Sequence, residues 1–200
     1  MLNLVIFGPP GSGKGTQSAK IAGKYNLCHL STGELFRREM EKGTMIGKEA
    51  GKYIDKGLLV PDEIVLRELY RQALEHLDSP GFIFDGFPRT IVQAETLDRL
   101  LEKKGIPISM VISVVVEEQE LFKRIRGRGE DSGRSDDSVD IAKLRLNVYK
   151  EQTRPLMDYY SVQGKIVSVN GMEPVDKVFD KICLAIDTFL VSRKVLPVVE

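Results

Sequence analysis

The stretch Met1-Leu-Asn-Leu-Val-Ile-Phe-Gly-Pro-Pro-Gly-Ser-Gly-Lys-Gly-Thr16 decides the fold of this chain. Residues 2–7 form a short apolar run with the length of a buried strand. The glycines that follow allow consecutive backbone N–H groups to point at one anion with no Cβ in the way. A helix beginning near Lys14 adds the positive end of its dipole to the same point. The stretch therefore predicts a phosphate-binding loop between a strand and a helix, rather than a simple glycine-rich turn.

One detail of this loop departs from the general P-loop pattern. In that pattern a hydroxyl residue directly follows the lysine and binds Mg²⁺. Here Gly15 follows Lys14, and the hydroxyl comes one place later at Thr16. We therefore assume no direct contact between Thr16 and a magnesium ion.

Composition limits the class of protein. The 200 residues suffice for one sizeable domain, and 29 basic residues balance 29 acidic ones, so no overall charge favours nucleic acid or an anionic membrane as a partner. Cys28 and Cys183 are single and far apart, which predicts reduced thiols in a cytoplasmic protein. No apolar run approaches the roughly twenty residues that span a bilayer, and residues 1–7 are interpreted as a core strand, not a signal peptide. We expect a soluble monomer, because no surplus apolar stripe is evident.

Apolar runs alternate with helical patterns along the chain, which predicts a parallel sheet covered by helices on both faces. Ligands then bind at the carboxyl ends of the strands. The run 110–116 is the richest in β-branched residues and is expected to be a central strand buried on both faces. Strands are predicted at 2–7, 27–30, 82–84, 110–116 and 165–169. Helices are predicted at 14–25, 31–42, 46–56, 61–76, 90–104, 118–126, 138–161 and 174–190, and the one at 138–161 allows a bend at Pro155.

A polar, glycine-punctuated segment interrupts this alternation. Residues 127–137 read Gly-Arg-Gly-Glu-Asp-Ser-Gly-Arg-Ser-Asp-Asp and contain no apolar side chain. We expect this segment to be a loop outside the core.

The run Asp85-Gly-Phe-Pro-Arg-Thr90 follows a predicted strand directly, so its polar groups come to the same sheet edge as the glycine loop. Asp85 is placed to orient a magnesium ion through its waters. Arg89 can clamp a phosphate with its planar fork. The alternative is a turn with a solvated arginine, which the position at a strand end disfavours.

Arginines form a further signal. Charged residues on helices are usually just a solvated face. However, Arg124 and Arg128 lie four residues apart and so face the same way, and phosphoryl transfer offers a protein much charge to stabilise. A ring of guanidinium groups therefore favours a site for several phosphates. The candidate arginines are Arg37, Arg89, Arg124, Arg128, Arg134 and Arg145.

Four motifs in order resemble the nucleoside monophosphate kinase family, most closely its adenylate kinase branch with a short lid. They are the loop 8–16, Ser31-Thr-Gly33, Asp85-Gly-Phe-Pro-Arg-Thr90 with Gln93, and Ser132-Gly-Arg-Ser-Asp-Asp137. The resemblance runs from residue 1 to about residue 190. It implies an α/β P-loop three-layer fold with a five-stranded parallel sheet. The implied core is 1–30, 61–126 and 138–200, with a helical NMP-binding insertion at 31–60 and a lid at 127–137.

The same resemblance implies roles for individual residues. ATP would be bound by Gly11, Ser12, Gly13, Lys14, Gly15, Thr16, Arg128 and, through its backbone, Glu173. AMP would be bound by Thr32, Arg37, Leu58, Leu59, Val60, Gly86, Phe87, Pro88, Arg89, Gln93, Arg134 and Arg145. The implied catalytic residues are Lys14, Arg89, Arg124, Arg128, Arg134 and Arg145, with Asp136 and Asp137 placing the lid arginines. Mg²⁺ would accompany ATP beside Asp85, whereas residues 127–137 hold no Cys or His, which excludes structural zinc.

The implied reaction is the reversible conversion of ATP and AMP into two ADP. The lid motif also resembles that of UMP–CMP kinases. However, the family pattern of those enzymes has Ser-Ala-Gly where this chain has Ser31-Thr-Gly33. Gln93 also offers the donor and acceptor that an adenine edge requires. Two other classes stay open. A small-molecule P-loop kinase should lack Gln93, Thr32 and Arg37, and a nucleotide switch without turnover would not need so many arginines. His29 and His76 are interpreted as ordinary structural residues.

Overall fold

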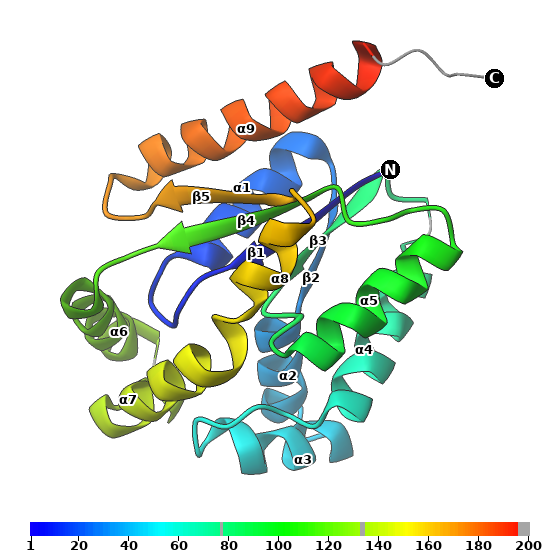
Figure 1. Cartoon of the computed structure of the whole chain (residues 1–200). Coiled ribbons are helices and arrows are strands. Elements are labelled where there is room, and N and C mark those ends of the chain that lie inside the picture. The colour runs from blue at the N-terminus through cyan, green and yellow to red at the C-terminus, as the bar shows by residue number, and fades with distance from the viewer. Residues whose placement is uncertain (77, 133–134, 196–200) are drawn as a thin grey trace.

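The computed structural model describes residues 1–76, 78–132 and 135–195. Its centre is a sheet of five parallel strands in the order β2-β3-β1-β4-β5 (Figure 1). The strands are β1 (Leu2–Phe7), β2 (Cys28–Ser31), β3 (Gly81–Asp85), β4 (Met110–Val115) and β5 (Ile166–Asn170). This architecture confirms the predicted fold class. The middle strand is β1, whereas β4 is an interior strand between β1 and β5 whose last residue, Val115, is half-exposed.

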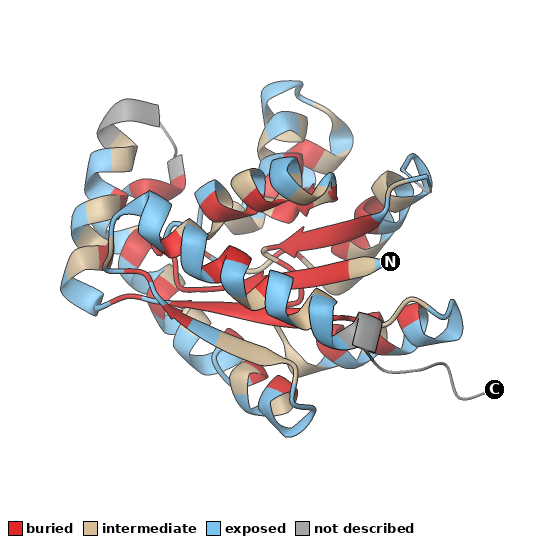
Figure 2. Ribbon diagram, turned by 90° about the horizontal axis from the view of Figure 1, so that it is seen from above, coloured by how far each residue is buried: buried red, intermediate tan, exposed pale blue. Residues whose placement is uncertain are grey.

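The sheet separates two helical layers with different cores (Figure 2). On one face, Leu4 and Ile6 of β1 pack with Ile182 of α9 (Val175–Val195), which lies beside α1 (Lys14–Tyr25). On the other face, Val5 and Phe7 belong to a cluster shared with α4 (Asp62–Leu74), α5 (Ile91–Lys103) and α8 (Leu156–Val162). Successive side chains of β1 thus pack against opposite helical layers, which gives a three-layer arrangement of helices, sheet and helices.

Strand register brings the functional motifs to one edge of the sheet. Asp85 pairs with Ile6 of β1 on one side and with Ser31 of β2 on the other. The glycine loop, the start of the next helix and the segment after Asp85 therefore leave the sheet together. This is the carboxyl edge at which ligands of parallel sheets bind.

Two helices follow β2 in the segment 31–60, where the insertion is predicted. Ser31 caps α2 (Thr32–Glu41) by accepting a hydrogen bond from the Glu34 amide at 3.4 Å, and Thr44 caps α3 (Met45–Ile54). The two helices cross closely, because a Cβ on Gly47 would lie 2.1 Å from the Glu39 carbonyl oxygen. A segment at 57–60 then leads into α4.

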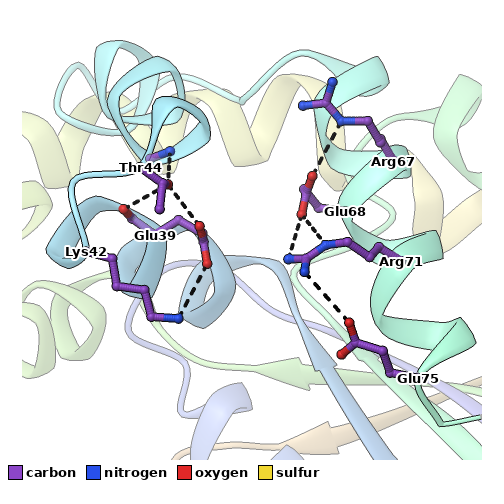
Figure 3. A network of polar contacts seen from close by, with 8 residues as sticks. Glu39, Lys42, Thr44, Arg67, Glu68, Arg71 and Glu75 are labelled. Atoms are coloured by element: carbon purple, nitrogen blue, oxygen red, sulfur yellow. Dashed lines mark hydrogen bonds and ion pairs between the residues drawn. The ribbon is translucent and has the colours of Figure 1, made fainter.

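Polar contacts stabilise this region (Figure 3). Thr44 donates a hydrogen bond to the Glu39 carboxylate at 2.9 Å, which joins the end of α2 to the start of α3. On α4, the buried Glu68 is paired with Arg67 at 3.4 Å and with Arg71 at 3.0 Å. A buried carboxylate needs such partners to offset its desolvation.

Residues 127–137 are neither a loop throughout nor wholly outside the core, so both predictions for this segment are wrong. Helix α6 (Glu118–Ser132) runs through most of the expected loop, and a 3₁₀ turn, η1 (Ser135–Asp137), follows. Asp136 and Asp137 are only 5% and 6% exposed, although this segment was expected outside the core. The physical reason is that a helical glycine costs only about 1 kcal/mol, and arginine partners make burial of these carboxylates possible.

The helix expected at 138–161, with a bend allowed at Pro155, is three pieces. These are α7 (Val139–Val148), a π-helical turn η2 (Tyr149–Thr153) and α8. Pro155 explains the break, because proline has no N–H to donate and its ring clashes with the preceding turn. The last helix, α9, extends beyond the predicted residue 190.

Candidate active site

The glycine loop between β1 and α1 has the geometry of an anion-binding nest. Gly11 and Gly13 adopt φ of 82° and 88°, which residues with a Cβ rarely adopt. At Gly8 a Cβ would lie 2.3 Å from the Ser12 hydroxyl. The loop delivers its amides and the start of α1 to the sheet edge.

A cavity of about 850 Å³ opens above this loop. This volume lies within the range of small-molecule sites, roughly 300–1,000 Å³. The cavity contains every described residue expected to hold ATP. Its lining includes Gly11, Ser12, Gly13, Lys14, Gly15, Thr16, Asp85, Arg124, Arg128, Arg145 and Glu173.

A second cavity lies between the insertion and the sheet edge. It is lined by most residues expected to hold AMP, namely Thr32, Arg37, Leu58, Leu59, Val60, Gly86, Pro88, Arg89, Gln93 and Arg145. Phe87 is the exception, because its side chain is 1% exposed and packs in the apolar core. Arg134 lies outside the described residues. The two cavities share four cationic side chains, those of Lys14, Arg37, Arg89 and Arg145.

Burial, with a contribution from neighbouring cations, lowers the pKa values of two of these groups. Burial lowers the pKa of Lys14 to about 8, although Asp85 opposes the shift. Burial also lowers the pKa of Arg89 to about 10, and the charge of Arg145 adds to this effect. Both shifts mean that the protein supplies less negative charge than these groups need. An anion bound where the cavities meet would therefore be stabilised by these cations.

Asp85 is an acidic group that lines the cavity above the glycine loop. Burial alone would raise its pKa, but contact with His29 and the charges of Lys14 and Arg89 outweigh burial, so the pKa is lowered. Its Oδ2 lies 3.6 Å from His29 Nε2 and accepts a hydrogen bond from Ser31 at 3.4 Å. A single ionised carboxylate suits Mg²⁺, which keeps several waters. Within 1–76, 78–132 and 135–195, no group of three or more His, Cys, Asp or Glu side chains could hold a metal ion.

The contact between His29 and Asp85 was not predicted from the sequence. A signal was available, because side chains two apart on a strand share a face. His29 and Ser31 both lie on β2 and both approach Asp85.

Three arginines of the candidate site lie on α6 and α7. Arg128 on α6 donates two hydrogen bonds to Asp137, at 2.7 and 2.6 Å. Arg145 on α7 contacts Asp136 at 2.9 Å and Asp137 at 3.1 Å. Arg124 is paired with Glu120 at 2.8 Å, one helical turn away. All three line the cavity above the glycine loop.

Hydrogen bonds order the other side of the site. Thr32 Oγ1 and Arg89 Nε both donate to the Gly86 carbonyl, at 3.0 and 2.7 Å. Gln93 accepts from the Arg89 amide at 2.6 Å and donates to Asp62 at 2.5 Å. Asp62 was not among the predicted site residues.

Residues of the π-helical turn η2 line one side of the second cavity, which was not predicted from the sequence. Tyr149 and Thr153 line the second cavity, and Thr153 donates to the Arg89 carbonyl at 3.0 Å. The sequence predicts a helix through these residues with a bend only at Pro155, so it does not indicate which way Tyr149 and Thr153 point.

A P-loop sheet whose two cavities meet at a cluster of cations defines a phosphotransferase of the nucleoside monophosphate kinase class. The family model for adenylate kinase matches residues 6–165, so the chain belongs to the adenylate kinase family. Among curated relatives, the adenylate kinase of Bacteroides fragilis is 49% identical over 188 residues, which are 94% of this chain and 100% of the relative. That of Parabacteroides distasonis is 49% identical over 94% of this chain and 98% of the relative. That of Kocuria rhizophila is 42% identical over 94% of this chain and 100% of the relative.

These comparisons do not favour the UMP–CMP kinase alternative. None of the helices within residues 1–76, 78–132 and 135–195 has the length and apolar character needed to cross a bilayer.

Proposed function

We propose that this protein catalyses the reversible, Mg²⁺-dependent transfer of a phosphoryl group from ATP to AMP, which yields two ADP and maintains adenine nucleotide balance. One observation carries the proposal: the cavity above the glycine loop and the cavity beside the insertion share Lys14, Arg37, Arg89 and Arg145. A donor in one cavity and an acceptor in the other would then meet at their phosphates.

Each group has a defined task in this proposal. Lys14 and the loop amides hold the donor phosphates, and Arg37 and Arg89 hold the acceptor phosphate. Bound Mg²⁺, held through water by Asp85, would neutralise charge on the phosphate oxygens. Because the acceptor oxygen attacks directly, no protein nucleophile is needed.

The remaining arginines would stabilise the charge of the transition state. Arg124 and Arg145 stand on α6 and α7 on either side of residues 127–137, and Arg128 and Arg134 are within that segment. We assign residues 127–137 as a lid and residues 31–60 as the insertion that binds AMP, on a core formed by the rest of the chain. Their closure would exclude water, which would otherwise take the phosphoryl group.

We further propose that the protein works as a monomer in the cytoplasm, with ATP, AMP and ADP as its partners. The free thiols of Cys28 and Cys183 support a reducing compartment. Light scattering of the purified protein should give the mass of one chain, and a dimer mass would reject this part of the proposal.

The activity is tested by a coupled assay of ADP production. With ATP and Mg²⁺ present, the rate should depend on added AMP and saturate with it, and UMP or CMP should replace AMP only poorly. A rate that ignores AMP would reject the proposal. A stronger response to UMP or CMP would move the protein to the pyrimidine enzymes.

A further inference from the structure

We propose that Asp62 is a positioning residue that fixes the amide of Gln93 in one orientation and thereby makes the acceptor pocket select an amino base over an oxo base. This inference rests on the proposed function, because it takes the acceptor cavity to be the AMP site. It concerns a residue that lies one step behind the pocket wall.

Both ends of the Gln93 amide are already engaged. Its Oε1 accepts a hydrogen bond from the Arg89 backbone N–H at 2.6 Å, and its Nε2 donates to Asp62 Oδ1 at 2.5 Å. Gln93 is 2% exposed, yet it lines the acceptor cavity. A buried amide with a partner at each end has one favoured orientation.

This orientation leaves one hydrogen-bond acceptor site and one donor site of the Gln93 amide for a ligand. An amide oxygen can accept two hydrogen bonds and an amide nitrogen can donate two. After the bonds to Arg89 and Asp62, Gln93 has one acceptor site and one donor site left. Adenine offers the complement, an exocyclic amino group that donates and a ring nitrogen that accepts. Hypoxanthine has nearly the same shape but the opposite pattern, because it carries a carbonyl oxygen and a ring N–H there.

An oxo base would therefore need the amide to turn over. In the turned state the Gln93 oxygen would face the Asp62 carboxylate, and its NH₂ group would face the Arg89 N–H. Two acceptors would oppose each other on one side and two donors on the other. Rejection by unpaired buried polar groups is far stronger than rejection by shape.

The position of Asp62 supplies a matched control. It is in the first turn of α4, separated from the segment 57–60 by Pro61 alone, and Glu63 follows it in the same turn. Acidic residues are favoured at a helix N-terminus in general, so the helix dipole alone accounts for both. Glu63, however, is exposed and does not line the acceptor cavity, whereas Asp62 contacts Gln93.

The test compares AMP with IMP as acceptors at saturating MgATP. In Asp62→Asn the carboxylate becomes an amide that can donate to a turned Gln93 oxygen. We expect the preference for AMP over IMP in kcat/KM to fall by about tenfold or more, through a higher KM for AMP with kcat nearly unchanged. Glu63→Gln should keep the preference of the original protein. An Asp62→Asn variant that retains this preference within about twofold overturns the inference.

A double-mutant cycle separates positioning from a general weakening of the fold. In a Gln93→Ala background, Asp62→Asn should change the AMP-to-IMP preference no further, because the group on which Asp62 acts is absent. Equal effects of Asp62→Asn with and without Gln93 would contradict the inference. The side-chain NH₂ resonances of Gln93 should also move in Asp62→Asn and not in Glu63→Gln, and unmoved resonances would contradict it without reference to turnover.

The two hypotheses fail in different ways. If the original protein does not use AMP, the proposed function itself is wrong. If it uses AMP and the Asp62→Asn variant discriminates equally well, only the role of Asp62 is wrong.

Discussion

Arg128 on α6 and Asp137 on η1 form a two-point ion pair, with distances of 2.7 and 2.6 Å. The Asp137 carboxylate also lies 3.1 Å from Arg145 on α7. One buried carboxylate thus joins two cations that line the cavity above the glycine loop. These contacts join the two ends of the proposed lid, residues 127–137, through groups that would contact the phosphates in the proposed reaction.

Removal of this carboxylate should impair turnover more than folding. In Asp137→Asn the guanidinium groups of Arg128 and Arg145 lose their shared anion, so we expect kcat to fall by about tenfold to a hundredfold. The measurement is the coupled assay, with Asp140→Asn as the control because Asp140 is an exposed acid on α7. An Asp137→Asn enzyme as active as the control would show that the ion pair has no part in catalysis.

Arg89 should be essential for the reaction. Its side chain lines both cavities, so Arg89→Ala should lower kcat by about a thousandfold while the circular dichroism spectrum stays the same. Arg99→Ala, which removes an exposed arginine from α5, is the matched control. Near-normal turnover of Arg89→Ala would refute its role as a phosphate clamp.

Lys14 should couple nucleotide binding to a proton. Its pKa is lowered to about 8, so near pH 8 a substantial fraction of the protein carries neutral Lys14. Triphosphate binding favours the charged form, so ATP should bind with proton uptake, and its affinity should fall as the pH rises through 8. Calorimetry of ATP without divalent metal, in buffers of different ionisation enthalpy, measures this uptake. Lys14→Met should abolish it, and equal uptake by that variant would assign the proton to another group.

The same shift has a consequence for stability. Between about pH 8 and the ordinary value of 10.5, the unfolded chain binds a proton at Lys14 that the folded chain has partly released. Lys14 should therefore make the free energy of unfolding rise with pH across this window. Urea unfolding at several pH values gives the free energy of unfolding of the original protein and of Lys14→Met. The original protein should gain stability relative to Lys14→Met as the pH rises through this window, and an unchanged difference would contradict the shift.

Asp98 should be important for stability and not for chemistry. This buried carboxylate accepts hydrogen bonds from Tyr159 at 2.9 Å, Tyr160 at 3.3 Å and Gln163 at 3.2 Å, which join α5 to α8 and the residue after it. Asp98→Ala would leave three donors without this acceptor, so we expect a loss of about 2–4 kcal/mol in urea unfolding. Glu102→Ala, at an exposed position of α5, should cost under about 0.5 kcal/mol. Equal stability of the two variants would contradict this account of Asp98.

Much of the fold could be predicted from the sequence because its signals are local. The apolar run before the glycine loop gives β1, and capping residues such as Ser31 and Thr90 begin α2 and α5 at the expected places. The candidate phosphate-binding positions could be predicted from strand ends, since parallel strands bring Ser31 and Asp85 to one edge.

The rest depends on contacts that no local pattern contains. Residues 127–132 look like a loop by composition, yet α6 continues through them, and Asp136 and Asp137 are buried against distant arginines. The contact of Asp62 with Gln93 spans two helices and becomes visible only in three dimensions. Tertiary partners, rather than propensity, decide these features.

The central claim is that two adenine nucleotides meet, phosphate to phosphate, at Lys14, Arg37, Arg89 and Arg145. A crystal structure with two adenosines joined by a chain of five phosphates tests it most directly. The account predicts one adenosine in each cavity, with all four cationic side chains within hydrogen-bond distance of the bridging phosphates. Phosphates bound away from these side chains, or both adenosines in a single cavity, would contradict it.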